Sequence, residues 1–313
     1  MSEFIEALIF DVDGTLADTE EAHRQAFNDA FRAYELDFCW SRELYRELLQ
    51  VTGGKERLAA FFHRTRLAAG ERIRLSALIP GLHAAKTASY LERIKLGRVP
   101  LRPGVRRLMS EARAAGVRLA IASTTSPDNV SALLEGALGE NALDEFSVIA
   151  TGDAVPRKKP APDIYLLALS RLGVTARRAV AFEDSAMGVA AAKAAGLFTV
   201  ATPSDWTRGQ DFAAADLVLP CLADSNWPLG AGDAWRVGAP YLGLAQLATF
   251  HAATFPRVAH SNRTFIGMGE RHGFHLAPAA PRSRGRVWLR RPGVQHQQHG
   301  AGPGDHAGRG RDR

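Results

Sequence analysis

Two carboxylates separated by one residue are the strongest chemical signal in the sequence. Asp11 and Asp13 follow the apolar run Ala7–Phe10 and precede Gly14. An aspartate is a competent nucleophile towards phosphorus, forming an aspartyl-phosphate, and a second carboxylate beside it can act as acid and base. Taken alone, the pair has an equally plain interpretation as a polar turn that ends a strand.

Two further polar segments favour the catalytic interpretation. Ser123-Thr124-Thr125-Ser126 precedes a predicted helix, so its hydroxyls and amides can bind phosphate oxygens, although such residues also serve as ordinary N-caps. Lys159, in the segment Lys158-Lys159-Pro160, can neutralise a phosphate and a nucleophilic carboxylate together. The alternative for this lysine is a solvated basic turn.

A second acidic pair, Glu183-Asp184, follows the apolar run Ala179–Phe182 and precedes Ser185. Adjacent acids at the end of a buried strand are costly unless they are paired or bind a cation. With Asp11 and the carbonyl of Asp13 they make an oxygen-rich set suited to Mg²⁺. Ser185 can cap the following helix in either case.

The elements that must position these residues alternate between strands and helices. Short apolar runs predict strands at Ala7–Phe10, Arg118–Ser123, Phe146–Ala150, Ala179–Phe182, Phe198–Ala201 and Leu217–Leu219. Alanine-rich segments predict helices at Val105–Ala115, Ser126–Leu138, Pro162–Leu172 and Ala186–Ala195. This alternation predicts an α/β fold: an open parallel sheet with helices on both faces.

The stretch Thr19–Leu96 interrupts that alternation and reads as several helices, separated near Asp37–Ser41, Val51–Gly54 and Gly70–Arg74. We predict a core domain of residues 1–18 and 97–225, with a helical cap of residues 19–96 inserted into it. Residues 97–100 and 102–104 are the expected return hinge. An extension, 226–256, carries one predicted helix at Ala239–Thr254. Residues 257–313 are rich in Gly, Arg and His, and we expect little fixed structure there.

Charge and cysteine content limit the function classes. The net charge is +6, but residues 257–313 carry +8, so residues 1–256 are slightly acidic. Nucleic-acid binding through the basic tail is therefore the alternative from another class, and we expect no nucleic-acid partner. An out-of-frame reading of a GC-rich gene would also yield such a tail. Two distant cysteines, the lack of a signal peptide and the lack of a membrane-length apolar run predict a cytoplasmic protein without a membrane partner, which we expect to be a monomer.

The four polar segments, in this order and each at a strand end, resemble the haloacid dehalogenase-like hydrolase superfamily over roughly residues 4–220. The resemblance implies a Rossmann-like core with a helical cap. It further implies that Asp11 is the nucleophile, Asp13 the acid and base, and Asp184 the main Mg²⁺ ligand. The phosphate-binding hydroxyl, the motif lysine and the assisting metal ligand would be Ser123, Lys159 and Glu183. Members that cleave carbon–halogen bonds lack the second aspartate, so Asp13 favours phosphoryl chemistry.

The cap segments Ala17–His23, Tyr45–Leu49 and Thr52–Arg57 resemble the CbbY-like branch, which implies hydrolysis of xylulose-1,5-bisphosphate to xylulose 5-phosphate. A Gly-rich turn beside cations suits the distal phosphate of a bisphosphate. It can also be a helix junction with solvated charges. The expected substrate contacts are Glu20, His23, Tyr45, Thr52, Gly53, Gly54, Lys55, Arg57, Lys86, Thr124 and Thr125. Helix packing is the alternative for Tyr45 and His23, and solvent exposure for Lys86.

The resemblance leaves two other activities open, and the first of them shares all four polar segments. A sugar-phosphate mutase of the β-phosphoglucomutase type passes the phosphoryl group to a second sugar hydroxyl instead of water. A phosphoglycolate phosphatase is a further alternative. The sequence motifs alone do not separate these activities.

Overall fold

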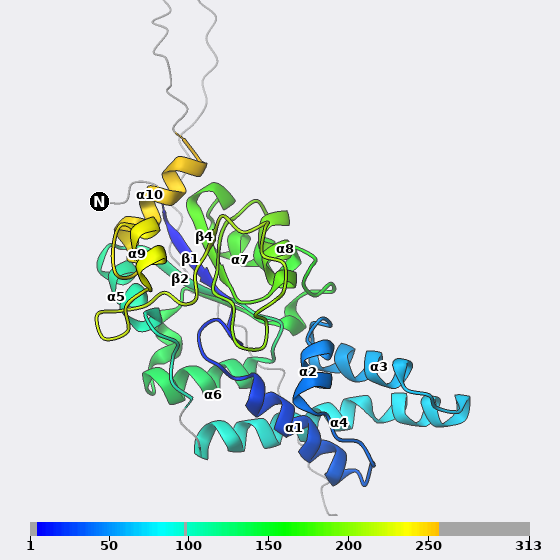
Figure 1. Ribbon diagram of the computed structural model, residues 1–313. Coiled ribbons are helices and arrows are strands. Elements are labelled where there is room, and N and C mark those ends of the chain that lie inside the picture. Colours follow the sequence, from blue (N-terminus) through cyan, green and yellow to red (C-terminus); the bar gives the residue numbers. More distant parts are fainter. Residues whose placement is uncertain (1–4, 97–98, 257–313) are drawn as a thin grey trace, which may run out of the picture. The chain divides into compact units, whose positions relative to one another are not determined.

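The chain forms a parallel sheet of six strands covered by helices on both faces, in a computed structural model that describes residues 5–96 and 99–256 (Figure 1). The strand order is β3-β2-β1-β4-β5-β6. The strands are β1 (Ala7–Phe10), β2 (Arg118–Ala122), β3 (Val148–Ala150), β4 (Ala179–Glu183), β5 (Phe198–Ala201) and β6 (Leu217–Val218). All paired neighbours run parallel. The α/β fold predicted from the apolar runs is therefore confirmed.

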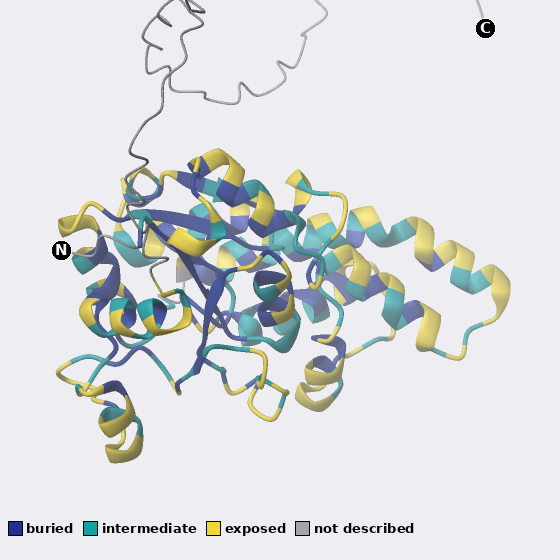
Figure 2. Cartoon of the chain, turned by 90° about the horizontal axis from the view of Figure 1, so that it is seen from above, coloured by how far each residue is buried: buried dark blue, intermediate teal, exposed yellow. Residues whose placement is uncertain are grey.

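Strand β1 shows why these runs are apolar throughout. Its residues alternate between two separate clusters of buried side chains: Leu8 and Phe10 lie in one, Ala7 and Ile9 in the other. The first cluster includes residues of α5 (Val105–Ala114) and α6 (Pro127–Leu138), and the second includes residues of α7 (Asp163–Leu172) and α8 (Ala186–Ala194). A strand buried on both faces has no polar side. Figure 2 shows the sheet as almost entirely buried, with exposed residues on the outer sides of the helices.

The connections along the sheet bring the polar segments to one edge. These connections also contain three short 3₁₀ helices, Ala142–Glu145, Gly152–Ala154 and Ala176–Arg178. From β1 the chain first adds β2 and β3 on one side, and it then crosses to place β4 on the other side of β1. Ligands of open α/β sheets bind at such a switch in strand order, outside the carboxyl ends of the strands. Asp11 and Asp184 follow the two strands that meet there.

Four helices form the inserted cap, which we define as α1 (Glu20–Ala33), α2 (Arg42–Leu48), α3 (Gly54–Arg64) and α4 (Ala69–Leu96). Their apolar faces make a cluster of their own, which includes Phe31, Trp40 and Leu58. The first two predicted breaks agree with the structure. The third is wrong, because Gly70–Arg74 is helical and the break lies at residues 65–68. The first N–H groups of a helix have no partner within the helix, so a glycine in the first turn disrupts few hydrogen bonds. Such a glycine is therefore a poor marker of a break between two helices.

The extension after the core contains two helices, α9 (Ala231–Val237) and α10 (Leu244–Thr254), where one was predicted over Ala239–Thr254. The prediction began too early, because Pro240 and Gly243 interrupt helical structure before Leu244. The predicted unstructured tail, 257–313, and the hinge residues 97–98 lie outside the described residues. In the ranges 5–96 and 99–256, no helix is long and apolar enough to cross a membrane.

Candidate active site

A pocket opens at the carboxyl edge of the sheet, and residues from both the core and the cap line it. The core contributes Asp11, Asp13, Asp184, Lys158, Lys159 and the segment 123–126. The cap contributes Glu20, His23, His83, Lys86 and the whole segment 52–57. Segments that are far apart in sequence thus meet in one cavity.

The nucleophile candidate, Asp11, is held by a buried lysine. The Nζ atom of Lys159 lies 2.6 Å from Oδ1 of Asp11 and 2.5 Å from Oε1 of Glu183, and Tyr165 also donates to that glutamate oxygen at 2.5 Å. Burial raises the pKa of Asp11 to about 8, against the opposing effect of Lys159. Burial lowers the pKa of Lys159, but Asp11 and Glu183 outweigh it, so the ammonium stays charged.

Three acids are close enough to share one cation. Asp11, Glu183 and Asp184 each place a carboxylate oxygen within 4.8 Å of the others. Within the described part of the chain, Oε2 of Glu183 is buried and has no hydrogen-bond partner. Burial, followed by Asp11 and Glu183, raises the pKa of Asp184 well above its ordinary value. A divalent cation with oxygen preference would favour the ionised form of these acids, and such a cation fits this set of carboxylate oxygens.

Gly14 allows this close approach. Its φ is +80°, and a Cβ atom at this position would lie 2.1 Å from Oδ2 of Asp184. A side chain here would therefore displace the acid. Asp13, predicted as a ligand through its carbonyl, keeps its side chain outside the acidic cluster.

The carboxylate of Asp13 instead faces the cap. It accepts from Thr19 Oγ1 at 2.5 Å and lies 2.9 Å from Nε2 of His23, whose Nδ1 atom is 2.7 Å from Nζ of Lys86. The Lys86 ammonium is a donor, so His23 accepts at Nδ1 and donates to Asp13 from Nε2. Burial alone would raise the pKa of Asp13, but His23 and Thr19 lower it to about 2. Asp13 is therefore ionised in the ligand-free site.

The segment after β2 supplies uncharged donors. Ser123 is buried at the strand end, and its Oγ accepts from the amide of Thr125. Thr124 and Thr125 also line the pocket. Helix α6 begins just after Ser126, whose hydroxyl does not cap it. Pro127 has no N–H group, so the amides of Asp128 and Asn129 are the first of this helix that remain available to an anion near its N-terminus.

The cap residues divide into those that line the pocket and one that does not. Glu20, His23, Thr52, Gly53, Gly54, Lys55, Arg57 and Lys86 all line it, as predicted contacts should. Tyr45 does not, which corrects its expected contact with sugar. Its ring is fully buried, and its hydroxyl donates to Glu20 at 2.7 Å and accepts from Arg57 at 2.9 Å. It is placed to orient those two pocket residues.

Several lining residues were not identified from the sequence. His83 contacts the backbone at Gly54, where a Cβ atom would lie 2.8 Å from its ring, and burial lowers its pKa to about 4. It precedes Lys86 by three residues, so helical spacing could have placed both on one face. Lys158, Asp153 and Asn129 also line the pocket. No pattern local to these three distinguishes them from exposed polar residues.

The chain is similar to known proteins over most of its described length. A family model for haloacid dehalogenase-like hydrolases matches residues 5–196. Protein CbbY of Rhodobacter capsulatus is 55% identical over 219 residues, covering 70% of this chain and 94% of the relative. CbbY of Cupriavidus necator is 45% identical over 255 residues, covering 80% and 98%. A crystal structure of a CbbY mutant from Rhodobacter sphaeroides in complex with xylulose-1,5-bisphosphate is 49% identical, with a TM-score of 0.66, covering 70% of this chain and 96% of that one.

Proposed function

The chain belongs to the haloacid dehalogenase-like hydrolase family and is a phosphatase, and we propose that it hydrolyses xylulose-1,5-bisphosphate to xylulose 5-phosphate with the help of Mg²⁺. The proposal rests on one observation: cationic side chains of both the core and the cap line a single pocket. Lys159 lies beside the nucleophile on the core, while Lys55 and Arg57 line the pocket from the cap. A substrate with a phosphate at each end matches two such sites. A related CbbY binds this sugar bisphosphate.

The first step is in-line attack of Asp11 on the reacting phosphorus, which breaks the bond to the sugar oxygen and forms an aspartyl-phosphate. Lys159, Ser123 and the first amides of α6 hold the phosphoryl oxygens. Asp11, Glu183 and Asp184 would hold Mg²⁺, which would neutralise charge on the transferring group.

Asp13 acts as the general acid in the first step and as the general base in the second. A phosphate dianion beside its carboxylate disfavours the charged form, so Asp13 takes up a proton when substrate enters and gives it to the departing sugar oxygen. The resulting carboxylate then accepts a proton from the water that attacks the aspartyl-phosphate. Hydrogen bonds from Thr19 and His23 orient this carboxylate throughout.

Residues of the cap recognise the sugar. Glu20 lines the pocket, and its Oε2 already accepts from Tyr45, so the remaining oxygen can accept from a sugar hydroxyl. Tyr45 acts behind it as a positioning residue. Arg57 donates to the same Tyr45 hydroxyl. Tyr45 therefore positions both Glu20, the proposed sugar contact, and Arg57, the proposed contact to the distal phosphate.

The decisive experiment is a comparison of inorganic phosphate release from xylulose-1,5-bisphosphate, xylulose 5-phosphate and glucose 1-phosphate, with and without Mg²⁺. We expect the bisphosphate to be preferred and Asp11→Asn to abolish release without unfolding the chain. Lys55→Met should raise KM for the bisphosphate and leave monophosphate hydrolysis almost unchanged. Isomer formation from glucose 1-phosphate without phosphate release would identify a mutase instead.

A further inference from the structure

The connection between β5 and β6 contacts both the acidic cluster and the cap. We call residues 202–208 of this connection the β5 loop. Ser204 and Thr207 each donate to Oδ2 of Asp184, at 2.9 and 3.3 Å, and both hydroxyls are buried. Two donors on one oxygen set the orientation of the carboxylate. Asp184 therefore depends on the conformation of the β5 loop.

Trp206 lies between these two hydroxyl residues but packs among cap residues. It is 5% exposed and belongs to the apolar cluster of the cap. Its ring makes an edge-to-face contact with the ring of Tyr45, with centroids 5.5 Å apart and the planes at 89°. The guanidinium carbon of Arg42 lies 4.3 Å from its ring centroid. A core residue is thus held by aromatic and cation–π contacts to the cap.

The contact continues into the substrate pocket. Tyr45, which touches Trp206, also binds Glu20 and Arg57, and both of these line the pocket. An unbroken chain of contacts therefore leads from the substrate side of the cap, through Tyr45 and Trp206, to the donors on Asp184.

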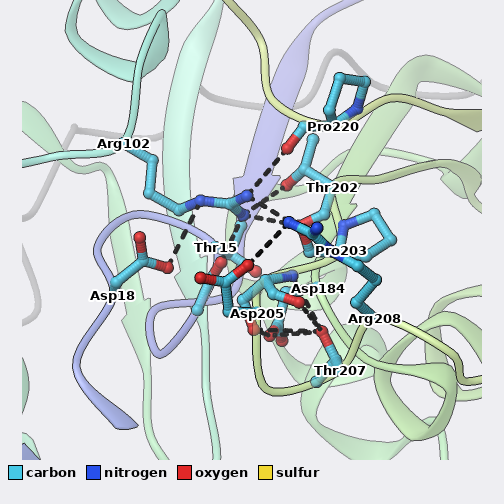
Figure 3. A network of polar contacts seen from close by, with 12 residues as sticks. Thr15, Asp18, Arg102, Asp184, Thr202, Pro203, Asp205, Thr207, Arg208 and Pro220 are labelled. Atoms are coloured by element: carbon cyan, nitrogen blue, oxygen red, sulfur yellow. Dashed lines mark hydrogen bonds and ion pairs between the residues drawn. The ribbon is translucent and has the colours of Figure 1, made fainter. Parts of the chain in front are cut away.

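Arg102 holds the start of the β5 loop. Its half-buried guanidinium donates to the carbonyls of Thr202 and Pro203, at 2.6 and 3.1 Å, and also to those of Gly14 and Pro220, at 2.5 and 2.9 Å (Figure 3). Arg102, in the expected return hinge, thus ties the start of the β5 loop to Gly14, three residues after Asp11. A displacement of Trp206 therefore acts on the segment from Ser204 to Thr207 rather than on the whole connection.

We propose that Trp206 is a positioning residue that couples the docked cap to the orientation of Asp184, so that Mg²⁺ binds more tightly when the cap is docked. The inference rests on the proposed Mg²⁺-dependent function. Its physical basis is that Trp206, once inserted into the cap cluster, restricts the backbone that carries both donors. Without that insertion, the two hydroxyls must be ordered at the time the cation binds.

The test is calorimetric titration of the full chain with Mg²⁺ alone, which needs no turnover. Ser204→Ala removes a donor directly and should weaken binding about tenfold or more. Trp206→Ala should weaken it by roughly three- to tenfold, and Trp206→Phe, which keeps an aromatic edge against Tyr45, should retain most of the affinity. Trp235→Ala is the matched control, because this tryptophan is 87% exposed on α9, and it should change nothing.

Arg42→Ala separates coupling from a purely local effect, because Arg42 belongs to the cap and lies outside the acidic cluster. We expect about twofold weaker Mg²⁺ binding, and no further loss when Arg42→Ala is added to Trp206→Ala, as a double-mutant cycle requires. If Arg42→Ala and Trp206→Ala lower only the melting temperature and bind Mg²⁺ as the unmodified chain does, the proposal is overturned. A chain that shows the coupling but releases phosphate from no sugar phosphate would refute the proposed function alone.

Discussion

Lys86→Met should make the protein more stable and less active. Lys86 is 4% exposed, and its ammonium lies between His23 and the rings of Phe27 and Tyr90, with the two ring centroids 5.3 and 5.0 Å away. Burial lowers its pKa from 10.5 to about 8, which means that the folded state disfavours the charged form. Each pKa unit corresponds to about 1.4 kcal/mol, so the penalty is about 3 kcal/mol at pH 7.

Methionine has a similar length and no charge, so the variant should recover part of that penalty. We expect a free energy of unfolding about 1–3 kcal/mol higher at pH 7, measured by urea denaturation. Between pH 8 and 10.5 the unfolded chain binds more protons at this lysine than the folded chain does. The stability of the unmodified protein therefore rises with pH in this window, and the advantage of the variant should fade there.

Activity should move in the opposite direction. Lys86 donates to Nδ1 of His23, which in turn orients Asp13, and it also contributes a positive charge to the pocket. Loss of one charge-assisted hydrogen bond predicts kcat/KM lower by about tenfold or more. Lys95→Met is the matched control, since Lys95 is exposed on the same helix, and it should alter neither quantity. A Lys86→Met protein that is less stable than the unmodified chain at pH 7 would refute the reasoning, because the ammonium would then be a net stabilising group.

Three further changes test the site. Gly14→Ala places a side chain against Asp184 at a residue with positive φ. The variant should lose about 1–2 kcal/mol of unfolding free energy, measured by denaturation, and should no longer bind Mg²⁺ in calorimetry. Unchanged Mg²⁺ binding would argue against the acidic cluster as the cation site. Tyr45→Phe loses the hydrogen bond to Glu20 and should raise KM several-fold with a smaller change in kcat; an unchanged KM would show that Glu20 needs no support. Burial lowers the pKa of His83 to about 4, so the unfolded chain binds more protons here between pH 6.5 and 4, and stability falls as the pH falls through this window. His83→Gln should remove part of that fall in a melting-temperature series, while His63→Gln, at an exposed histidine, should not.

Fold and chemistry were predictable from the sequence where the signal was local. Strands such as Ala7–Phe10 are buried on both faces, so burial alone makes them continuous apolar runs. The polar residues that end them have to lie at one sheet edge, because parallel strands present their carboxyl ends together. Asp11 and Asp184 directly follow β1 and β4, so the sequence alone places them near one another, whereas Lys159 lies nine residues after β3 and was placed by its resemblance to the family motif.

What only the tertiary structure decided are the contacts made between distant elements. Ser204 and Trp206 look like ordinary loop residues, yet one orients Asp184 and the other packs against Tyr45 in the cap. Tyr45 itself has helical spacing that suits either a pocket or a core, and only the packing of α2 against its neighbours turned it inward. Local patterns report how a residue meets solvent and its own backbone. They hold no information on which partner from another element will meet it, because that depends on how the cap and the sheet pack together.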